Sequence, residues 1–211
     1  MRFVGIDPAT KTGFVALDED GTVLVEREIQ GIGKKQPGGI TTEQLVSLEN
    51  QLYSLLKPGD IIAIEQPAVG TQMGVTTGMI HGGLRSMIYR KELTYDDVNP
   101  QRTKKFVDAN RRVPTKEKKA VIAAAVKDHY GYEHSSDNVT DAYILAQIAR
   151  AMEEARRTGY IKKTPLFQYE VLKAILDPEP KAKTKAKTNK RPGKPAAAGS
   201  HTHLKEQQFL F

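Results

Sequence analysis

The sequence predicts an α/β fold in which a mixed five-stranded sheet is flanked by helices. Three observations predict this fold. The apolar runs at residues 1–7 and 61–67 have the length and composition of buried strands. Residues 13–29 alternate apolar and polar side chains around an Asp20-Gly21 turn, which is the pattern of a β-hairpin. After the hairpin, segments with helical spacing alternate with short strands, an order typical of α/β proteins.

The N-terminal half of the chain is predicted to begin with a three-stranded antiparallel meander. Its elements, in order, are a strand at 1–7, a tight turn at 8–13, the two hairpin strands within 13–29, a helix at 41–56 and a strand at 61–67. Leucines of the helix recur at helical spacing, and Thr41 with Gln44 can form a capping box in front of it. The last strand is nearly continuous in apolar residues, so we expect a buried parallel strand that carries Glu65 at its carboxyl end.

The C-terminal half is predicted to be mainly helical. Its elements are a helix at 72–90, a strand within 93–100, a short helix at 101–107, a helix at 115–131, a helix that starts within 134–146 and ends near Arg157, and a short helix within 164–176. Thr115 is the expected N-cap of the helix at 115–131, and Gly131 is its expected end. Glycines interrupt the helix at 72–90, which weakens it unless its backbone packs closely, as it would against a second subunit.

The basic residues of the chain are concentrated in two segments. The net charge is +7, and residues 177–206 hold eight Lys or Arg against three Asp or Glu. This segment is rich in Lys, Pro and Ala and has almost nothing to bury, so we expect a disordered basic tail. Residues 102–119 hold eight basic and two acidic residues, a stripe that can face phosphate groups or form a solvated helix face. The chain is therefore predicted to contain a folded domain at 1–176, a linker at 177–206 and a terminal peptide at 207–211.

The composition also excludes several classes of protein. With no cysteine, the chain can form no disulfide, thiolate nucleophile or cysteine zinc site. No apolar run approaches the roughly 18 residues of a membrane span, and the start of the chain lacks the apolar region of a signal peptide. We therefore expect a cytoplasmic protein that does not bind membranes.

Acidic residues stand at comparable places in three predicted elements. Asp7 and Glu65 end the two most apolar strands, and Asp137 and Asp141 lie one turn apart at the start of a helix. Taken singly, an Asp before Pro is often a turn residue, and an Asp at a helix start is often a cap. In open α/β sheets, however, the carboxyl ends of central strands lie close together, so these side chains can share one pocket.

Carboxylates that share a partly dry pocket repel one another unless a cation neutralises them. Oxygen ligands without His or Cys favour Mg²⁺, with Mn²⁺ as a substitute, over Zn²⁺. Two such ions, about 3.5 to 4 Å apart, suit the in-line hydrolysis of a phosphodiester. The sequence thus predicts a two-metal nuclease site formed by Asp7, Glu65 and the acids of the helix.

Three separate motifs resemble the RuvC family of Holliday junction resolvases within the RNase H-like superfamily. They are GIDPATKTGFVAL, IAIEQP and DNVTDAYILA, which follow one another within about residues 1–157. The resemblance implies an RNase H-like nuclease domain over residues 1–176. It further implies a homodimeric, Mg²⁺-dependent crossover junction endodeoxyribonuclease that nicks two opposite strands of a four-way DNA junction.

The resemblance also assigns roles to the acids. Carried over by motif, Asp7 would bridge the metal ions, and Glu65 and Asp141 would be further ligands. The family's usual fourth ligand, Asp or His, falls three residues before the last acid, where this chain has Asn138. Asp137 can supply the missing charge from one turn before Asp141, so we predict Asp137 as the fourth ligand, with Asn138 assisting.

Lys118 matches a family lysine that is placed near the scissile phosphate. It belongs to the basic stripe, and the predicted DNA contacts are Arg111, Arg112, Lys116, Lys118 and Lys119. The classical enzyme of the family also carries an aromatic wedge shortly after its glutamate, whereas residues 66–74 of this chain contain no aromatic residue. Shape and backbone readout would then carry more of the specificity.

Two other functions are compatible with these motifs. An RNase H-like nuclease could act on forks, flaps or RNA/DNA hybrids, since the basic stripe suits each of these substrates. Asn138 is also compatible with a protein that binds junctions without cleaving them. The compact chain, with its tail and without cysteine, suits a phage or bacterial protein.

The last five residues form a hydrophobic end to a polar tail. Residues 207–211, QQFLF, resemble the pentapeptide by which bacterial DNA-processing enzymes bind the sliding clamp. Gln207, Leu210 and Phe211 are the predicted contacts. A flexible linker would keep the domain mobile while such docking raises its local concentration. The alternative is a tail that packs on its own domain or has no role.

Overall fold

Five strands form one mixed sheet in the computed structural model, which describes residues 1–67 and 74–178. The strands are β1 (Arg2–Asp7), β2 (Lys11–Leu17), β3 (Val23–Gln30), β4 (Asp60–Glu65) and β5 (Tyr95–Val98), in the order β3-β2-β1-β4-β5. The pairs β1·β2 and β2·β3 are antiparallel, whereas β1·β4 and β4·β5 are parallel. The predicted α/β fold with a five-stranded mixed sheet and an N-terminal meander is confirmed.

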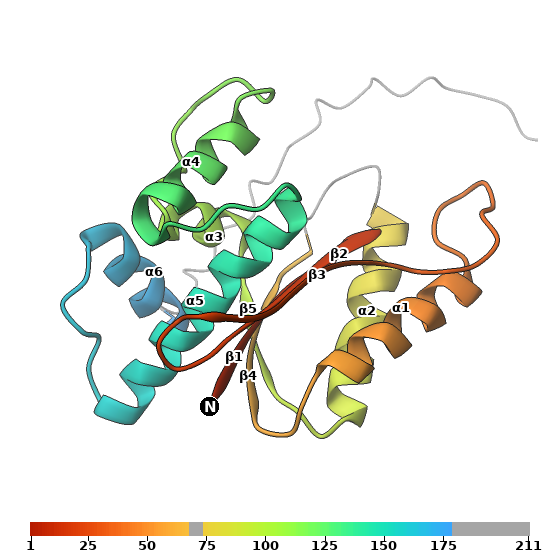
Figure 1. Cartoon of the computed structure of the whole chain (residues 1–211), viewed down its shortest axis with the longest axis horizontal. Coiled ribbons are helices and arrows are strands. Elements are labelled where there is room, and N and C mark those ends of the chain that lie inside the picture. The colour runs from red at the N-terminus through yellow and green to blue at the C-terminus, as the bar shows by residue number, and fades with distance from the viewer. Residues whose placement is uncertain (68–73, 179–211) are drawn as a thin grey trace, which may run out of the picture. The chain divides into compact units, whose positions relative to one another are not determined.

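Helices cover both faces of this sheet (Figure 1). Their bounds are α1 (Thr42–Leu55), α2 (Gly74–Arg90), α3 (Pro100–Phe106), α4 (Lys118–Tyr130), α5 (Asp137–Thr158) and α6 (Leu166–Leu176). Apolar side chains of α1 and α2 pack against one face of the sheet, and those of α3, α4, α5 and α6 pack against the other. Because side chains alternate along a strand, a central strand supplies both cores. In β1, Phe3 faces α5, while Val4 and Ile6 face α1 and α2.

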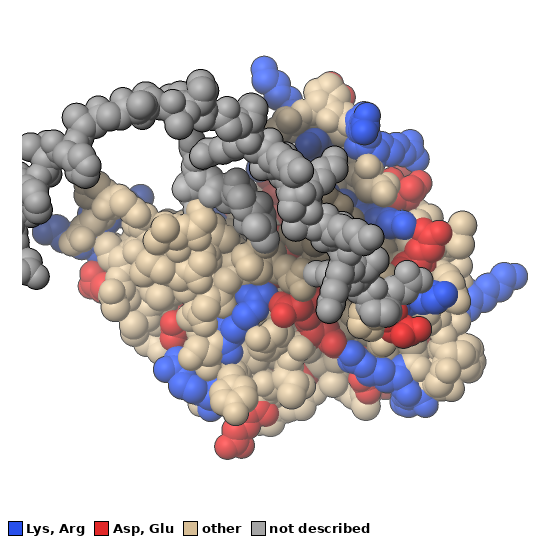
Figure 2. Space-filling view, turned by 180° about the vertical axis from the view of Figure 1, so that it is seen from behind, with Lys and Arg blue, Asp and Glu red and all other residues tan. Residues whose placement is uncertain are grey.

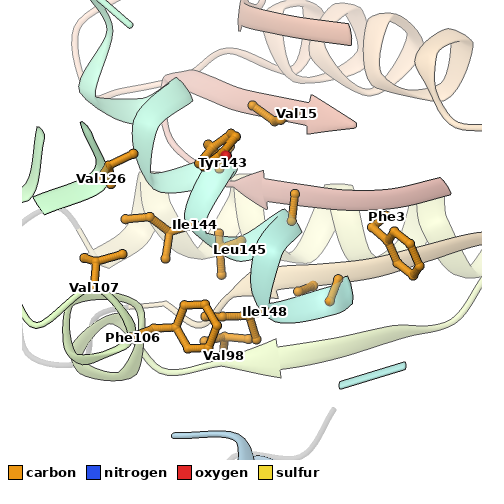
Figure 3. Packing of buried hydrophobic residues seen from close by; sticks show 14 of the residues in the cluster. Phe3, Val15, Val98, Phe106, Val107, Val126, Tyr143, Ile144, Leu145 and Ile148 are labelled. Atoms are coloured by element: carbon orange, nitrogen blue, oxygen red, sulfur yellow. The ribbon is translucent and has the colours of Figure 1, made fainter. Parts of the chain in front are cut away.

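The larger core surrounds α5, as Figure 3 shows. Tyr143, Ile144, Leu145 and Ile148 of this helix are buried among residues of the sheet and the surrounding helices. The central helix is therefore held on several sides, which fixes where its first turn lies relative to the strand ends.

Local signals set most helix ends as the sequence predicts. Thr41 and Gln44 form the expected capping box in front of α1. Gly131 ends α4 in the left-handed conformation, with a φ of 66°, where glycine carries no Cβ penalty. The helix of the third motif begins at Asp137 behind the N-cap Ser136.

The expectation that Thr115 caps α4 is wrong. The helix begins three residues later, at Lys118, and its N-cap Glu117 makes no side-chain capping bond to the described residues. The reason is a turn in front of the helix, in which the Glu117 amide donates to the Pro114 carbonyl over 2.9 Å. Residues 115–117 belong to this turn, so the helix does not begin directly after Thr115.

Several predictions concern segments beyond these bounds. The first two residues of the helix predicted at 72–90 lie outside the described residues. So do nearly all of the linker at 177–206 and the whole peptide at 207–211. Within residues 1–67 and 74–178, no helix has the length and apolar character needed to cross a membrane.

Candidate active site

The N-terminal part of α5 lies directly on the backbone of β1 and β2. A Cβ added at Gly5 would lie 1.9 Å from the Ala142 carbonyl oxygen, and one at Gly13 would lie 1.9 Å from the Asn138 carbonyl oxygen. No side chain fits in either space, so both positions require glycine. These two contacts bring the first turns of α5, with Asp141, down to the carboxyl end of β1.

The structure brings Asp7, Glu65 and Asp141 together. Asp7 is the last residue of β1 and is buried, and Glu65 is the last residue of the neighbouring parallel strand β4. The register pairs Ile6 with Ile64, so the two acids that follow project from the same face of the sheet. Asp7 and Glu65 share a hydrogen bond, the charge of Asp141 acts on Glu65, and the charge of Asp7 acts on Asp141.

Burial and mutual repulsion disfavour the ionised forms of all three acids. Burial raises the pKa of Asp7 well above its usual range, and the nearby Glu65 charge raises it further. Burial, followed by the charge of Asp141, raises the pKa of Glu65 to about 7. Burial and the charge of Asp7 raise the pKa of Asp141 to about 7 as well. Three carboxylates in such a place require a proton or a cation to balance them.

Lys104 is a cation that acts on all three acids of this cluster. It lies half-buried on α3, and its charge lowers the pKa of Asp7, Glu65 and Asp141 against the larger effect of burial. The adjacent Lys105 forms an ion pair with Glu170 of α6 over 2.5 Å instead. Lys104 carries no sequence signal of this role, because nothing distinguishes two consecutive lysines until the placement of α3 decides which one faces the acids.

The two candidates for the fourth ligand make different contacts. Asp137 is exposed and forms an ion pair with Lys119 of α4, and its charge also raises the pKa of Asp141. Asn138 is half-buried, and its Nδ2 donates to Glu28 Oε2 of β3 over 3.5 Å. Glu28 is a further acid beside the first turn of α5 that the sequence analysis did not select.

The donor set fits a hard divalent cation, although the side chains are not arranged around one. In the part of the chain that the structure describes, no three His, Asp or Glu side chains form a group that could hold a metal ion as they stand. The acids are close enough to raise one another's pKa, however, and a side-chain hydrogen bond links Asp7 and Glu65. A cation would replace the shared proton. Oxygen donors alone suit Mg²⁺ or Mn²⁺.

Comparison with known proteins bears on the architecture that holds these acids. No protein-family model matches the chain, and no curated protein sequence matches it. Thermus thermophilus RuvC in complex with a Holliday junction substrate aligns with a TM-score of 0.56 and 16% sequence identity, over 75% of this chain and 96% of that chain. A second Thermus thermophilus RuvC structure aligns with a TM-score of 0.50 and 20% identity, over 75% of this chain and 97% of that one.

This chain has a RuvC-like fold. The resemblance that the three motifs indicate is thereby confirmed at the level of the fold.

In this RuvC-like fold, the residues predicted to contact DNA are exposed around the start of α4. They are Arg111, Arg112, Lys116, Lys118 and Lys119. Figure 2 shows Lys and Arg side chains at the upper right, where α3 and α4 lie, with Asp and Glu side chains among them. Two of the five already have acidic partners, since Arg111 pairs with Asp108 over 3.2 Å and Lys119 pairs with Asp137.

Arg85 of α2 supports the candidate site from the opposite face of the sheet. Its Nη2 donates to the Glu65 carbonyl oxygen over 3.0 Å and to Asp97 Oδ1 of β5 over 2.6 Å. Its Nη1 contacts His81 Nδ1 over 2.7 Å. Burial and the Arg85 charge lower the pKa of His81 to about 4, so the neutral ring can accept this bond. Arg85 thus fixes the strand end that carries Glu65, a role that no local sequence signal reveals.

Proposed function

We propose that this protein is a metal-dependent endonuclease that resolves four-way DNA junctions, and other branched DNA, by paired hydrolysis of phosphodiesters. The observation that carries the proposal is the meeting of Asp7, Glu65 and Asp141 beside Lys104, at the carboxyl ends of two parallel strands in a RuvC-like fold. The junction-bound RuvC structure of the same fold supports DNA branches as the substrate class.

Each residue of the cluster has a proposed task. Asp7, Glu65 and Asp141 would hold Mg²⁺, or Mn²⁺ in its place, with two ions in each active site. Bound ions of this kind supply Lewis-acid chemistry, because they polarise the phosphodiester and assist the attack of water. To hold a cation, the Asp7 and Glu65 carboxyl groups would have to give up the proton that they share. The Lys104 ammonium group is placed to neutralise phosphate charge beside the acids.

The identity of the fourth metal donor and the role of Lys118 stay predictions. We propose Asp137, assisted by Asn138, as the fourth donor, since Asp137 lies near enough to raise the pKa of Asp141. Asp137 would have to exchange its ion pair with Lys119 for that role. Lys118 lies exposed on the first turn of α4, where it can contact the DNA backbone near the site.

A homodimer would place two such sites on one junction. Helix α2 supports this part of the proposal, because Val75 and Met79 are exposed on it and none of the described atoms would lie within 4 Å of a Cβ at Gly78 or Gly82. A surface of apolar side chains and glycines allows close packing of a second copy. Two sites in one dimer can nick the two opposite strands of a junction.

The experiment is a cleavage assay on labelled synthetic DNA with Mg²⁺. The substrates are a four-way junction and, as controls, a duplex, a fork, a flap and an RNA/DNA hybrid. Symmetric nicks at the junction support the proposal. A preference for forks, flaps or hybrid would indicate another RNase H-like nuclease, and a gel shift without cleavage would indicate a junction-binding protein.

Asp7→Asn tests the metal site within that assay. We expect cleavage to be lost and junction binding to be kept, because the variant removes one carboxylate from the cluster and no basic residue. Asp18→Asn is the matched control, since Asp18 lies in the exposed β2–β3 turn and an amide oxygen can still accept the bonds from Asp20 and Thr22. Cleavage by Asp7→Asn would show that the site is wrongly assigned.

A sliding-clamp contact is a separate part of the proposal. Residues 207–211 lie outside the described residues, and the case for this contact is their sequence, with Gln207, Leu210 and Phe211 as the anchors. A pulldown on the clamp should retain the intact chain and not a chain that lacks residues 207–211. Equal retention of the two chains would refute the contact.

A further inference from the structure

Glu28 of β3 lies in the same row of the sheet as Asp7. The register pairs Asp7 with Gly13 of β2, and Gly13 with Glu28. Residues paired directly across strands project from the same face of a sheet, so Glu28 faces the same side as Asp7, where α5 packs. Gly13 has no side chain between the two acids, and the backbone of Asn138 fills that space.

The Glu28 carboxylate contacts residues at the start of α5 and a lysine of the neighbouring strand β2. Ser136 Oγ and Asn138 Nδ2 both donate to its Oε2, the latter over 3.5 Å. Lys11 Nζ lies 3.2 Å from its Oε1.

These contacts join an edge strand to the first turn of α5. Ser136 is the N-cap of α5, and its Oγ also accepts the Val139 amide over 3.4 Å. A carboxylate beside a helix N-terminus is further stabilised by the helix dipole. The contact with Asn138 Nδ2 also directs Asn138 Oδ1 away from Glu28, because the two atoms lie on opposite sides of the planar amide.

We propose that Glu28 is a positioning residue of the acidic site, which holds the first turn of α5 so that Asp141 stays beside Asp7 and the oxygen of Asn138 is turned away from β3. The inference rests on the proposed function. It also bears on Asn138, which stands where the resemblance leads us to expect Asp or His, since Glu28 of β3 brings a negative charge to this end of α5.

Glu26 provides a matched control on the same strand. It lies two residues before Glu28 and projects from the same face, because the register pairs it with Val15. Its Oε2 accepts a hydrogen bond from the Tyr132 hydroxyl over 2.6 Å. Glu26 therefore also contacts the segment that precedes α5, but four residues before Ser136 and away from the row of Asp7.

The test compares Glu28→Ala, Glu28→Gln and Glu26→Gln with the wild-type protein in single-turnover cleavage of a four-way junction. Loss of a residue that orients the ligands of a metal site commonly costs 10- to 100-fold in activity. We expect a loss of about that size in the rate constant for Glu28→Ala. Glu28→Gln should lose less, because its amide oxygen can still accept from Ser136, and Glu26→Gln should keep the wild-type rate.

Two further readouts separate positioning from a DNA contact or general loss of structure. Junction affinity, measured by gel shift in an Asp7→Asn background, should be unchanged or tighter for Glu28→Ala, because the variant removes a negative charge. Hydrogen exchange in peptides that cover residues 136–145 should become faster in Glu28→Ala and not in Glu26→Gln.

Several outcomes would overturn the inference. They are a wild-type cleavage rate in Glu28→Ala, an equal loss in Glu26→Gln, or a loss of cleavage that is matched by a loss of junction affinity. If the wild-type protein cleaves no branched DNA, the proposed function fails. Hydrogen exchange at the start of α5 then still decides whether Glu28 holds this turn.

Discussion

Replacing Asp141 by Asn is expected to stabilise the metal-free protein at alkaline pH while abolishing cleavage. The reason is that the native fold holds this carboxylate half-buried beside other acids. Burial and the charge of Asp7 raise its pKa from the usual 3.8 to about 7. Asn has nearly the same shape and no charge, so it occupies the site without that electrostatic cost.

The difference between the usual and the raised pKa of Asp141 gives the size of the expected stabilisation. A gap of about three pH units corresponds to about 4 kcal/mol of free energy for the ionised side chain. The Asn amide must still find hydrogen-bond partners, so we expect a net gain in the free energy of unfolding of about 1 to 3 kcal/mol at pH 8.

The sign of the pH dependence follows from proton binding. Between pH 4 and pH 7 the folded protein keeps a proton on Asp141 that the unfolded chain has lost, so the free energy of unfolding of the wild type falls as the pH rises. The cost is fully present above the raised pKa and absent below the unfolded one. The advantage of Asp141→Asn over the wild type should therefore shrink by about 2 to 3 kcal/mol between pH 8 and pH 5.

The assay is urea unfolding at pH 8 and pH 5, with a chelator and with Mg²⁺. Mg²⁺ should stabilise the wild type at pH 8 and the variant less, since binding to the native state alone adds to its stability. Asp18→Asn is the matched control, because Asp18 lies in the β2–β3 turn and an amide oxygen there can still accept the bonds from Asp20 and Thr22, so this variant should change the free energy of unfolding little at either pH, with or without Mg²⁺. If the wild type and Asp141→Asn differ equally at both pH values, the reasoning is refuted.

Two further predictions concern the placement of α5 and the cation beside the acids. Gly5→Ala should destabilise the protein by about 1 to 3 kcal/mol or more, because its Cβ would lie 1.9 Å from the Ala142 carbonyl oxygen. Gly74→Ala at the first residue of α2, where the described residues leave open space, should be neutral or stabilising by up to about 1 kcal/mol. Denaturant unfolding checks both, and equal stabilities would contradict the close packing of α5 on β1. Lys104→Met should reduce junction cleavage by about 10-fold or more, as loss of an electrostatic group beside a reacting phosphate does, whereas Lys105→Met, which loses only the pair with Glu170, should not. Equal rates for the two lysine variants would exclude the role assigned to Lys104.

Much of the fold could be predicted because its signals are local. The alternation around Asp20-Gly21, the capping box at Thr41 and the glycine at position 131 each depend on residues within one turn or one hairpin. The prediction that Thr115 caps α4 was wrong because its local signal fits two different structures. A Thr in front of a helical pattern is compatible with a cap or with a preceding turn, and the bond from Glu117 to Pro114 selects the turn.

The sequence by itself determined which residues could form the site, whereas the tertiary structure decided which of them meet. Acids that end apolar strands are visible in the sequence, because a charge in that position is costly unless it has a use. Which of Lys104 and Lys105 faces the acids depends on how α3 is oriented on the sheet. The contact of Glu28 with Ser136 joins positions that are 108 residues apart in the sequence. Contacts of this kind leave no periodic pattern, since they arise only when the glycines of β1 and β2 let α5 lie on the sheet.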